Sequence, residues 1–567
     1  MISIDQVNLL SINIAMDPYF KNSDGLIVTY KSNNPDLLNI RTSNISGIKF
    51  SVEDVSSERQ TVVLATDEPY LDTVNAWDIA HAAKAADQNI DFVEPDLTVK
   101  LQSSGAKNDT IQPLSFKANT RCLPSSDYND FWPHPSIPIA WHLKDEFSQL
   151  ATARSTYVKT NKVNIAHLDT GYTPGHKLLP KNIIHDYEAN FASDGGRPGS
   201  AIDSCNNNLG NQAAHGTGTI CILAGAEINI NNQKIVLGGA PDASILPIRI
   251  SPSVILLKTS ALVKALDYIL QLYTDKETPL KIDVISMSMG GLASKEWARA
   301  VNQIYERGIF MVTAAGNNLG GKTPTHIVYP ARFNRVVAAC GVTYDYDQYY
   351  RSSIGFQMMG NYGPDRLMGT ALAAYTPNIP WAKGCCDNKS LFDIDGAGTS
   401  SATPQIAAAA ALYINKYKKT LDKLEGWQKV EAVRHALFTS ADVITTVAQS
   451  DSFKYFGNGI LKAKDALNIA PRVSLLQQTT ADSVRFPLFQ VLLRRIDYGV
   501  LEMYELEILQ LLSQSYNLQQ ILGNYESFLD LGTDAKKDFI DELLANDNAS
   551  MSLRNFLKDN YTELTSQ

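Results

Sequence analysis

The stretch VNIAHLDTG, residues 163–171, decides the fold of the central part of the chain. Its apolar run from Val163 to Leu168 predicts a buried strand, and the Thr170-Gly171 pair predicts the turn that ends it. Asp169 therefore stands at a strand end, where a carboxylate is held rigidly and is partly shielded from water. Taken alone, an Asp in this position is more often a turn residue than a catalytic one.

Two further stretches carry residues that complement this carboxylate. HGTGTICILA begins at His215, and its small residues followed by apolar ones indicate a helix that packs closely on its neighbours. GAGTSSATP, residues 396–404, contains Ser400 and leads into an alanine run. Because proline is tolerated in a first helical turn, we expect a helix to begin at Ser400. The positive end of its dipole then favours negative charge that develops at the serine.

Asp169, His215 and Ser400 together have the chemistry of a nucleophilic hydrolase. A serine hydroxyl is a weak nucleophile at neutral pH, so it needs a base within hydrogen-bond reach and a third group that fixes the tautomer of the base. His215 is the candidate base and Asp169 the candidate orienting group. The chain order Asp, His, Ser is one of three unrelated orders in which this geometry occurs.

Two more segments favour catalysis over the structural alternative. Asn317 follows a strand-like apolar run, and its amide could donate to a tetrahedral oxyanion, a contribution of roughly 10² to 10³ in rate. The alternative for Asn317 is an ordinary Asn-Asn turn. The segment DVISMSMGG, residues 283–291, is a second buried strand that ends in small residues. We expect its exposed backbone to pair with an extended peptide.

With these five segments, residues 131–470 resemble the subtilisin-like serine proteases, or subtilases. The resemblance implies an α/β catalytic domain with a mostly parallel sheet flanked by helices, and a serine endopeptidase that acts on protein or peptide substrates. It assigns Asp169, His215 and Ser400 to the catalytic triad and Asn317 to the oxyanion hole. It also implies two walls of a substrate channel, formed by Ser288, Met289 and Gly290 on one side and by Ala314, Ala315 and Gly316 on the other.

The chain departs from the family pattern at several positions near the triad. Gly218 stands where secreted members have a second His, but that His is not catalytic. Gln405 stands where His is usual. Ser401 stands where Met is usual, so two neighbouring hydroxyls are candidate nucleophiles. The GTS frame and the spacing to Pro404 favour Ser400.

The family spacing from Asn317 to Tyr329 is kept without a gap, which places Val328 where the floor of the specificity pocket is usually Gly or another small residue. A branched side chain there makes the pocket shallow and apolar. We therefore expect small or medium residues before the scissile bond. Because one methylene is worth only about 1 to 3 kcal/mol of discrimination, the selectivity is expected to be modest.

Residues 230–241 resemble the loop that holds a tight calcium site in secreted bacterial subtilisins. Calcium binds six to eight oxygens that normally include carboxylates. This loop has no Asp or Glu and contains Lys234, and Leu178 stands where the family places a liganding Asp. We expect no metal at this position and no other cofactor.

Residues 1–100 predict a small α+β domain, with strands at 25–30 and 61–65 and a helix-like stretch at 72–88. The string IDFVEPD, residues 90–96, resembles the last strand of a subtilase prodomain, which packs on the catalytic domain and places its tail in the channel. Residues 101–130 follow as a linker, and its polar part at 101–117 is the expected site of activation cleavage. The alternative is a surface loop of a permanently attached domain.

The catalytic domain is expected to span residues 131–472, and residues 473–567 predict a small acidic all-α domain because their apolar residues recur at helical spacing. Thr533 is a candidate helix cap. We expect this domain to dock a regulatory partner protein or to restrain the protease. A purely stabilising tail is the competing interpretation.

Length and composition agree with a large multidomain protein: 567 residues, of which 44% are hydrophobic. The net charge of −9 and the lack of a basic stripe argue against a nucleic-acid partner, and no apolar run is long enough to predict a membrane helix.

No secretory signal is visible in residues 1–24. The six cysteines lack zinc-ligand spacing, and Cys221 and Cys340 lie in apolar segments. Reduced thiols in the cytoplasm are the simplest account.

Two function hypotheses from different classes follow. The leading one is a serine endopeptidase that is held inactive or targeted by its flanking domains. The alternative is a catalytically silent subtilase that acts as a binding scaffold, although such a scaffold has no need to retain all four chemical residues. An esterase or a peptide ligase would use the same triad, because the acyl-enzyme is common to all three reactions.

Overall fold

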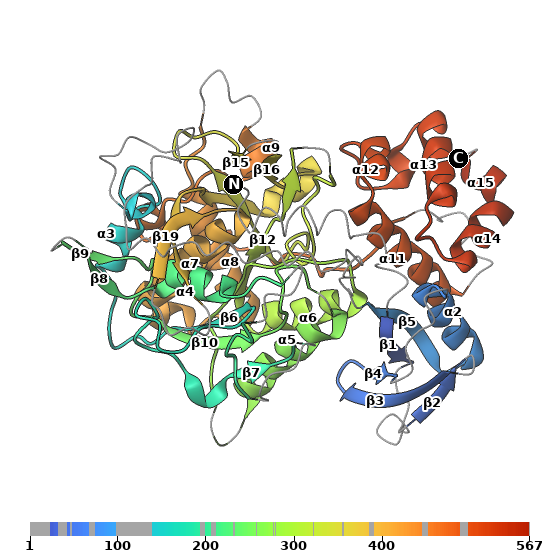
Figure 1. Ribbon diagram of the computed structural model, residues 1–567, viewed down its shortest axis with the longest axis horizontal. Helices are drawn as coiled ribbons and strands as arrows, with labels where there is room; N and C mark the ends of the chain where they lie inside the picture. Colours follow the sequence, from blue (N-terminus) through green and yellow to red (C-terminus); the bar gives the residue numbers. More distant parts are fainter. Residues whose placement is uncertain are drawn as a thin grey trace, which may run out of the picture.

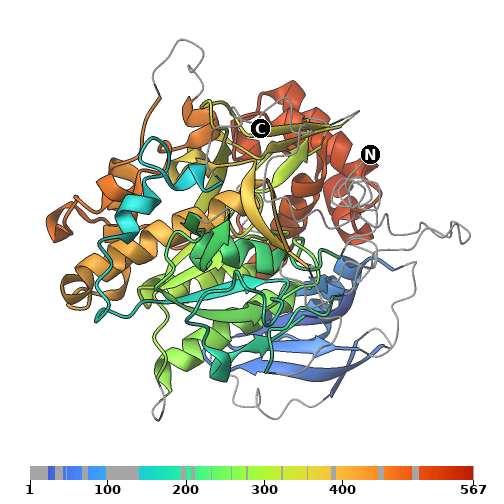
Figure 2. The same cartoon turned by 60° about the vertical axis from the view of Figure 1, so that its left-hand side comes forward.

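The computed structural model describes residues 23–31, 42–45, 48–66, 74–97, 139–192, 199–205, 211–230, 233–256, 258–275, 277, 279–320, 323–353, 356–384, 391–444, 452–487 and 497–565. These residues form a central α/β part, an N-terminal α+β part and a C-terminal helical part (Figure 1). In Figure 1 the blue N-terminal sheet lies below the red C-terminal helices, and both lie to the right of the central part. Figure 2 shows the two flanking parts again together on one side. The predicted fold class is confirmed.

The central part is built on a seven-stranded sheet in which every strand pair is parallel. Its strands, in spatial order, are β17 (Ala371–Tyr375), β14 (Val337–Val342), β12 (Phe310–Ala314), β11 (Val284–Met287), β6 (Asn164–Asp169), β10 (Ser244–Arg249) and β7 (Ala189–Asn190). Parallel strands are buried on both faces, which explains their near-continuous apolar sequences. Their carboxyl ends meet at one edge of the sheet, and Asp169 lies there.

Helices cover both faces of this sheet. Ile165 of β6 packs in a core with α4 (His215–Ala224), α7 (Thr399–Leu421) and α8 (Gly426–Thr439). Its neighbours Ala166 and Leu168 pack in the other core, with α5 (Thr259–Thr274) and α6 (Lys295–Glu306). Because successive side chains of a strand point to opposite faces, this alternation fixes β6 between two helix layers.

Smaller elements surround the sheet. They are α3 (Leu150–Arg154), β8 (Glu227–Ile230), β9 (Gln233–Val236), β13 (Asn317–Leu319), β15 (Tyr350–Ser353), β16 (Phe356–Gly360), β18 (Ile379–Lys383), β19 (Leu391–Gly396), α9 (Ser452–Phe456) and α10 (Ala463–Ala466). The strands β8 and β9 form an antiparallel hairpin in the loop that resembles a calcium site. Leu178 is buried in an apolar cluster with Cys221. Within the described ranges, no three His, Cys, Asp or Glu side chains come together as a metal site.

The N-terminal part is an antiparallel sheet with one described helix packed on it. The sheet order is β2 (Thr42–Ile45), β3 (Ile48–Ser56), β4 (Thr61–Ala65), β1 (Ser23–Tyr30) and β5 (Ile90–Leu97). The helix α2 (Ala76–Ala86) begins after Asn75, whose side chain accepts a hydrogen bond from the Trp77 N–H. The two strands and the helix expected here are present.

The last strand of this part, β5, supplies carboxylates that accept hydrogen bonds from the first turns of two helices of the central part. Asp96 accepts hydrogen bonds from the Ser260 N–H (2.8 Å) and hydroxyl (2.7 Å) at the start of α5. Glu94 accepts one from the Glu296 N–H (3.0 Å) at the start of α6. Burial raises the pKa of Glu94 to about 8. These contacts join the N-terminal part to the central part, and the prodomain role stays a prediction.

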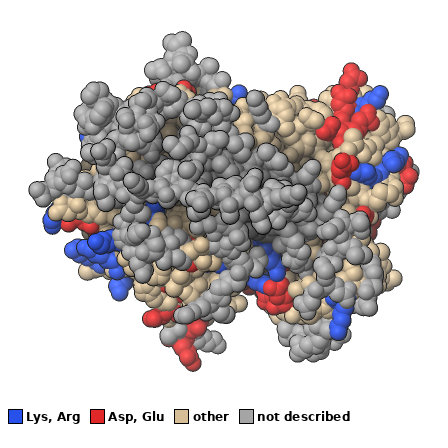
Figure 3. Space-filling view, viewed as in Figure 1, with Lys and Arg blue, Asp and Glu red and all other residues tan. Residues whose placement is uncertain are grey.

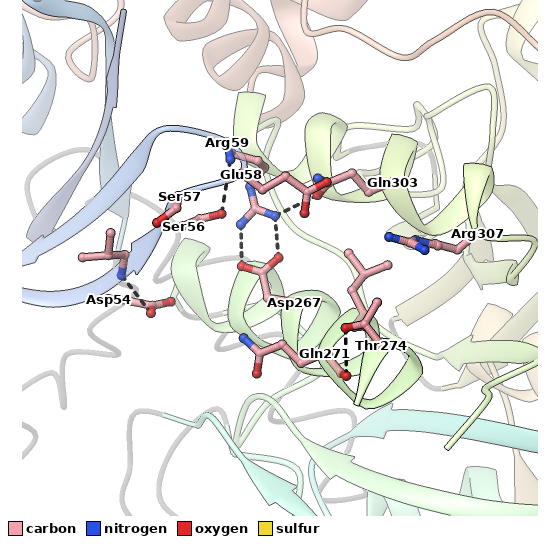
Figure 4. Close-up of a pocket in the computed structure, with 12 residues that line it drawn as sticks. Asp54, Ser56, Ser57, Glu58, Arg59, Asp267, Gln271, Thr274, Gln303 and Arg307 are labelled. Carbon is pink, nitrogen blue, oxygen red and sulfur yellow. Dashed lines mark hydrogen bonds and ion pairs between the residues drawn. The ribbon is translucent and has the colours of Figure 1, made fainter. Parts of the chain in front are cut away.

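An arginine from the turn between β3 and β4 ties the same surfaces together. Figure 4 shows Arg59 reaching toward Asp267 on α5, where the guanidinium forms a two-point ion pair with the carboxylate. Arg59 also donates to Glu296 (2.8 Å) and to Gln303 (2.9 Å) on α6. Paired guanidinium and carboxylate groups give geometric specificity as well as energy, so this contact fixes how the N-terminal part sits on α5 and α6.

The C-terminal part consists of helices α11 (Tyr498–Gln514), α12 (Tyr516–Leu522), α13 (Thr533–Ala545), α14 (Met551–Asp559) and α15 (Tyr561–Thr565). Thr533 is the first helical residue of α13, because Gly532 before it has the extended cap conformation, so the predicted cap is wrong by one residue. Figure 3 shows acidic and basic side chains interspersed over these helices, on the right of the view. Among the helices described, none is long and apolar enough to cross a bilayer.

The described cysteines are of two kinds. Cys221 and Cys340 are buried free thiols, which confirms them as core residues, and burial raises the pKa of each to about 12. Cys205 forms a disulfide bond with a partner outside the described residues. The expectation of reduced thiols is therefore wrong at Cys205, because its sulfur is already bonded. The cytoplasmic location stays a prediction.

Candidate active site

Three elements bring Asp169, His215 and Ser400 to the carboxyl edge of the central sheet. Asp169 is the last residue of β6, His215 is the first residue of α4, and Ser400 is the second residue of α7. The His215 Nδ1 and Asp169 Oδ1 atoms are 2.7 Å apart. An ionised carboxylate can only accept, so His215 carries its proton on Nδ1 and leaves Nε2 free to act as a base.

Asp169 is fully buried and held on both oxygens. Its Oδ1 also accepts from the Thr170 N–H (2.8 Å), and its Oδ2 accepts from the Thr219 hydroxyl (3.0 Å). Burial by itself would raise the pKa of Asp169, but the charge and hydrogen bond of His215 outweigh it and hold the pKa below its ordinary value. The carboxylate is therefore ionised and fixed in direction at neutral pH.

A second buried acid shapes the turn into α4. Ala214, directly before His215, has a left-handed backbone with φ of 67°. Asp203 accepts a hydrogen bond from its N–H (2.8 Å) and another from the Cys205 N–H (2.8 Å). Burial raises the pKa of Asp203. This positioning role was not predicted, because an Asp in a polar stretch has no distinctive sequence signal.

The Ser400 and Ser401 hydroxyls have different surroundings. The Ser401 hydroxyl is fully buried and donates to the Ala397 carbonyl (3.1 Å). Ser400 as a residue is 8% exposed, and its hydroxyl lies 3.4 Å from the Ser288 carbonyl oxygen. Across the described residues, no hydrogen bond joins Ser400 to the His215 ring. Such bonds are often long before substrate binds and tighten in the complex.

Pro404 links the nucleophile to the neighbouring strand β11. It lies in the second turn of α7, because the helix begins at Thr399 and not at Ser400 as expected. A proline there has no N–H for the carbonyl four residues earlier, which belongs to Ser400. The Ser288 hydroxyl donates to that carbonyl instead (3.0 Å). The predicted channel wall and the candidate nucleophile are thus fixed to each other.

Asn317 is oriented by the turn that precedes Ser400. Its Oδ1 accepts a hydrogen bond from the Thr399 N–H (3.0 Å), so the amide nitrogen points the other way. A Cβ built on Gly398 would lie 3.1 Å from Asn317 Nδ2. Asn317 also begins a strand, β13, that pairs with β16, and is not part of a simple Asn-Asn turn. The amide donor is therefore held beside the nucleophile turn.

Val328 lies between the two predicted walls of the specificity pocket. A Cβ built on Gly290 would come within 2.3 Å of Val328 Cγ2, and one built on Gly316 within 3.0 Å of Val328 Cγ1. The Val328 N–H donates to the Ala315 carbonyl (3.0 Å), which fixes the side chain in this place. Four further wall residues are buried, and these are Ser288, Met289, Ala314 and Ala315.

The backbone of the first channel wall differs from expectation. The Gly290 N–H donates to the Val254 carbonyl (3.1 Å), and the Gly290 carbonyl accepts from the Leu256 N–H (2.9 Å). The expected exposed backbone is therefore wrong at Gly290. Sequence could not reveal this pairing because the two segments are distant along the chain.

Trp381 of β18 covers one side of the candidate base. Its ring centroid lies 5.3 Å from that of His215, with an interplanar angle of 64°. A Cβ at Gly218 would lie 2.0 Å from the indole, which explains why Gly replaces the family His at this position. Trp381 was not predicted. The sequence signal for this contact was Gly at position 218 in place of a large side chain, which leaves room for a side chain from another segment.

The chain is similar to one known family and to several of its members. A model of the subtilase family matches residues 160–459. Subtilisin DY of Bacillus licheniformis is 28% identical over 309 residues, which cover 54% of this chain and 92% of that protein. The major intracellular serine protease of Bacillus subtilis (strain 168) is 29% identical over 193 residues, which cover 33% of this chain and 53% of that protein.

A solved structure gives the same result for the fold. Fervidolysin from Fervidobacterium pennivorans, a keratinolytic enzyme related to subtilisin, superposes with a TM-score of 0.50 at 17% identity. The superposition covers 80% of this chain and 62% of that one. The family model spans more than half of the chain and includes all three candidate triad residues. This chain therefore belongs to the subtilase family of serine endopeptidases.

Proposed function

We propose that the chain cleaves peptide bonds through an acyl-enzyme, with Asp169, His215 and Ser400 as the catalytic triad. The observation that carries this proposal is the 2.7 Å hydrogen bond between His215 Nδ1 and Asp169 Oδ1. It places the proton of the neutral His215 ring on Nδ1 and so makes Nε2 the basic nitrogen, in an element that packs directly against the helix carrying Ser400. A base in the correct tautomer is what a serine nucleophile needs.

In the first step, Ser400 Oγ attacks the carbonyl carbon of the scissile bond. His215 Nε2 takes the hydroxyl proton, and Asp169 stabilises the imidazolium that forms without taking the proton itself. The tetrahedral intermediate then collapses, the C–N bond breaks, and His215 returns the proton to the leaving amine. In the second step, a water molecule attacks the Ser400 ester by the same route and releases the acid.

The oxyanion of each tetrahedral intermediate has two donors in this proposal. One is Asn317 Nδ2, which Thr399 turns toward the nucleophile by holding Oδ1. The other is the backbone N–H of Ser400 in the first turn of α7, where N–H groups lack helical acceptors. Donors that are fixed before the reaction lower the barrier without reorganisation.

A fluorophosphonate probe tests this function directly. We expect the probe to label the full-length protein on Ser400, located by mass spectrometry of the labelled peptide. Mapping new termini of the incubated protein adds a second readout, because autoproteolysis is expected within residues 101–117, a region outside the described residues. Absence of labelling under any activating condition would favour the binding scaffold instead.

We also propose that Val328 restricts the residue before the scissile bond to small or medium size. Its methyl groups occupy the space between Gly290 and Gly316. Replacing Val328 with Gly removes three carbons, so we expect the ratio of kcat/KM for Phe over Ala substrates to rise about 10- to 100-fold. Parallel kinetics on the two substrates measure this ratio, and the Ala substrate serves as the internal control. A parent enzyme that already prefers Phe, Arg or Lys contradicts the proposal.

We further propose that the flanking parts restrain the protease together. Gln510 of α11 bridges them: its Oε1 accepts from the Trp77 indole N–H (2.9 Å), and its Nε2 donates to the Ala293 carbonyl (2.8 Å). A second link joins Lys295, the first residue of α6, to Glu502 of α11 (2.6 Å). The C-terminal part thus touches both the prodomain-like part and the catalytic part, and holds the first on the second.

Replacing Gln510 with Ala is expected to increase the peptidase activity of the full-length protein about tenfold, because two buried hydrogen bonds across both contacts are lost. The rate of fluorophosphonate labelling measures the effect. Gln514→Ala is the matched control, since Gln514 lies one turn further along α11 and its Nε2 donates to the Gln510 carbonyl of the same helix. Equal rates for both variants and the parent would show that the bridge does not restrain the enzyme.

A further inference from the structure

The wall of the substrate channel at Gly290 is closed by another segment of the chain. Residues 254–256 run parallel to Gly290, with a bridge between Ile255 and Gly290. The Gly290 N–H and carbonyl are both paired within this bridge, at 3.1 Å and 2.9 Å. A peptide that adds itself as a strand needs these two groups free, because main-chain hydrogen bonds supply its affinity.

The covering segment is itself held on its other side. The Ile255 carbonyl accepts from the Ser251 hydroxyl (3.1 Å), and the Ile255 N–H donates to Ser253 Oγ (3.3 Å). The Val254 N–H donates to Gln212 Oε1 (2.7 Å). The Ile255 backbone therefore has no free edge for an incoming strand, and a peptide that displaced the segment would also expose these partners.

The Leu256 side chain anchors the segment in the core. It is 5% exposed and packs in the hydrophobic cluster that contains Trp297. A Cβ built on Gly291 would lie 3.2 Å from Leu256 Cβ and 2.7 Å from the Trp297 ring, so Gly291 lies in close contact with both. The closure is thus made by backbone pairing, hydroxyl contacts and buried apolar packing together.

Strand geometry determines which substrate residue meets this closure. Along an extended peptide, every second residue presents its N–H and carbonyl to the same neighbour. The residue before the scissile bond lies beside Ser288, whose carbonyl oxygen is 3.4 Å from the Ser400 hydroxyl. The third residue before the bond then lies beside Gly290. This third residue gains no net main-chain hydrogen bonds there. Each bond that it could form with Gly290 would replace one that Gly290 already makes with Val254 or Leu256.

From this geometry we propose that the enzyme forms main-chain hydrogen bonds with only two residues on the amino side of the scissile bond. The third and fourth residues find the backbone of Gly290 and Ile255 already paired, so its substrates are peptides cut close to their amino ends, or exposed chain segments that turn away after the second residue. This inference rests on the proposed function, because it concerns the same Ser400 site.

A series of peptidyl phosphonates tests the inference on the full-length protein. The probes place one to four alanines before a phosphonate that reacts with Ser400, and the second-order labelling rate is measured for each. We expect the third and fourth alanines to change the rate by less than about threefold. In contrast, two new backbone hydrogen bonds would raise it about 30-fold. A parent rate that rises tenfold or more with these residues overturns the proposal.

Two variants and a control test whether the closed wall at Gly290 is the reason that the labelling rate does not depend on probe length. V254G/I255S/L256G removes the anchoring side chains, and S251A/S253A is a milder change that removes only the hydroxyls that hold Ile255. In at least one of them we expect the third and fourth alanines to accelerate labelling by tenfold or more. The control S155A/S440A removes hydroxyls that donate to carbonyls of α3 and α8, outside the channel wall, and is expected to behave like the parent. Length-independent rates in both folded variants contradict the closure.

A measurement that does not need catalysis keeps the two proposals apart. Hydrogen exchange of the Gly290 and Leu256 amides reports whether the bridge exists in solution, and we expect both to exchange slowly. If no probe labels Ser400, the proposed function is wrong, and slow exchange still supports the closed wall. Rapid exchange of these two amides overturns the closed wall whatever the labelling shows.

Discussion

We expect the Ser400→Ala protein to lose roughly 10⁶ in kcat for peptide cleavage, the size of loss that follows removal of the serine nucleophile in subtilisin. The physical reason is that no other hydroxyl takes its place. The Ser401 hydroxyl is fully buried and already donates to the Ala397 carbonyl, in the turn just before α7. Activity on a chromogenic peptide and labelling by a fluorophosphonate probe measure the loss.

Ser401→Ala is the matched control for this variant. It removes one hydroxyl from the neighbouring position of the same helix turn, and we expect activity within about tenfold of the parent because only the hydrogen bond to the Ala397 carbonyl before α7 is lost. Each variant removes a single oxygen atom. We therefore expect little change in the packing around Ser400, which is 8% exposed, or around Ser401, which is fully buried. A Ser401→Ala protein that is inactive while Ser400→Ala keeps activity would reverse the assignment of the nucleophile.

The second large effect is expected at Asp169. Replacing it with Asn should lower kcat by roughly 10⁴, because an amide cannot hold His215 in the tautomer with its proton on Nδ1. The change is nearly isosteric: with the amide nitrogen in the place of Oδ1, facing His215, the amide oxygen can still accept from the Thr219 hydroxyl. The fold is therefore expected to survive, and the loss appears in kcat.

The measurement for Asp169→Asn is a pH profile of kcat/KM beside a thermal melt. Asp242→Asn on the exposed surface is the control for removing one negative charge. If Asp169→Asn retains more than a hundredth of the parent kcat at neutral pH, Asp169 does not orient the base, and the 2.7 Å contact is only structural.

Much of the fold was predictable because the central strands are buried on both faces. Their apolar runs stand out in the sequence, and each is followed by small residues where the chain turns toward the sheet edge. Asp169 and Asn317 follow two such runs, and the structure places both at the carboxyl edge beside the start of α7. Local sequence carries this information because strand ends and helix starts have strong residue preferences.

Contacts between distant segments were not predictable from one sequence. The pairing of Gly290 with residues 254–256 depends on backbone groups, which every residue has, so it leaves no residue signature. The contact between Trp381 and His215 was equally unpredictable from the sequence, because it requires β18 to lie over α4. For the C-terminal part, apolar spacing predicted the helices. It did not predict that Gln510 would hydrogen-bond to both Trp77 and Ala293.

The contact between Trp381 and Gly218 also constrains how this active site could change over time. A larger side chain at position 218 would overlap the indole, with a Cβ only 2.0 Å from it. A bulky side chain at position 218 and the indole of Trp381 therefore cannot occupy their present places together. A second substitution that shrinks residue 381 would relieve this overlap and leave one side of His215 uncovered. The effects of substitutions at the two positions are therefore expected to be non-additive.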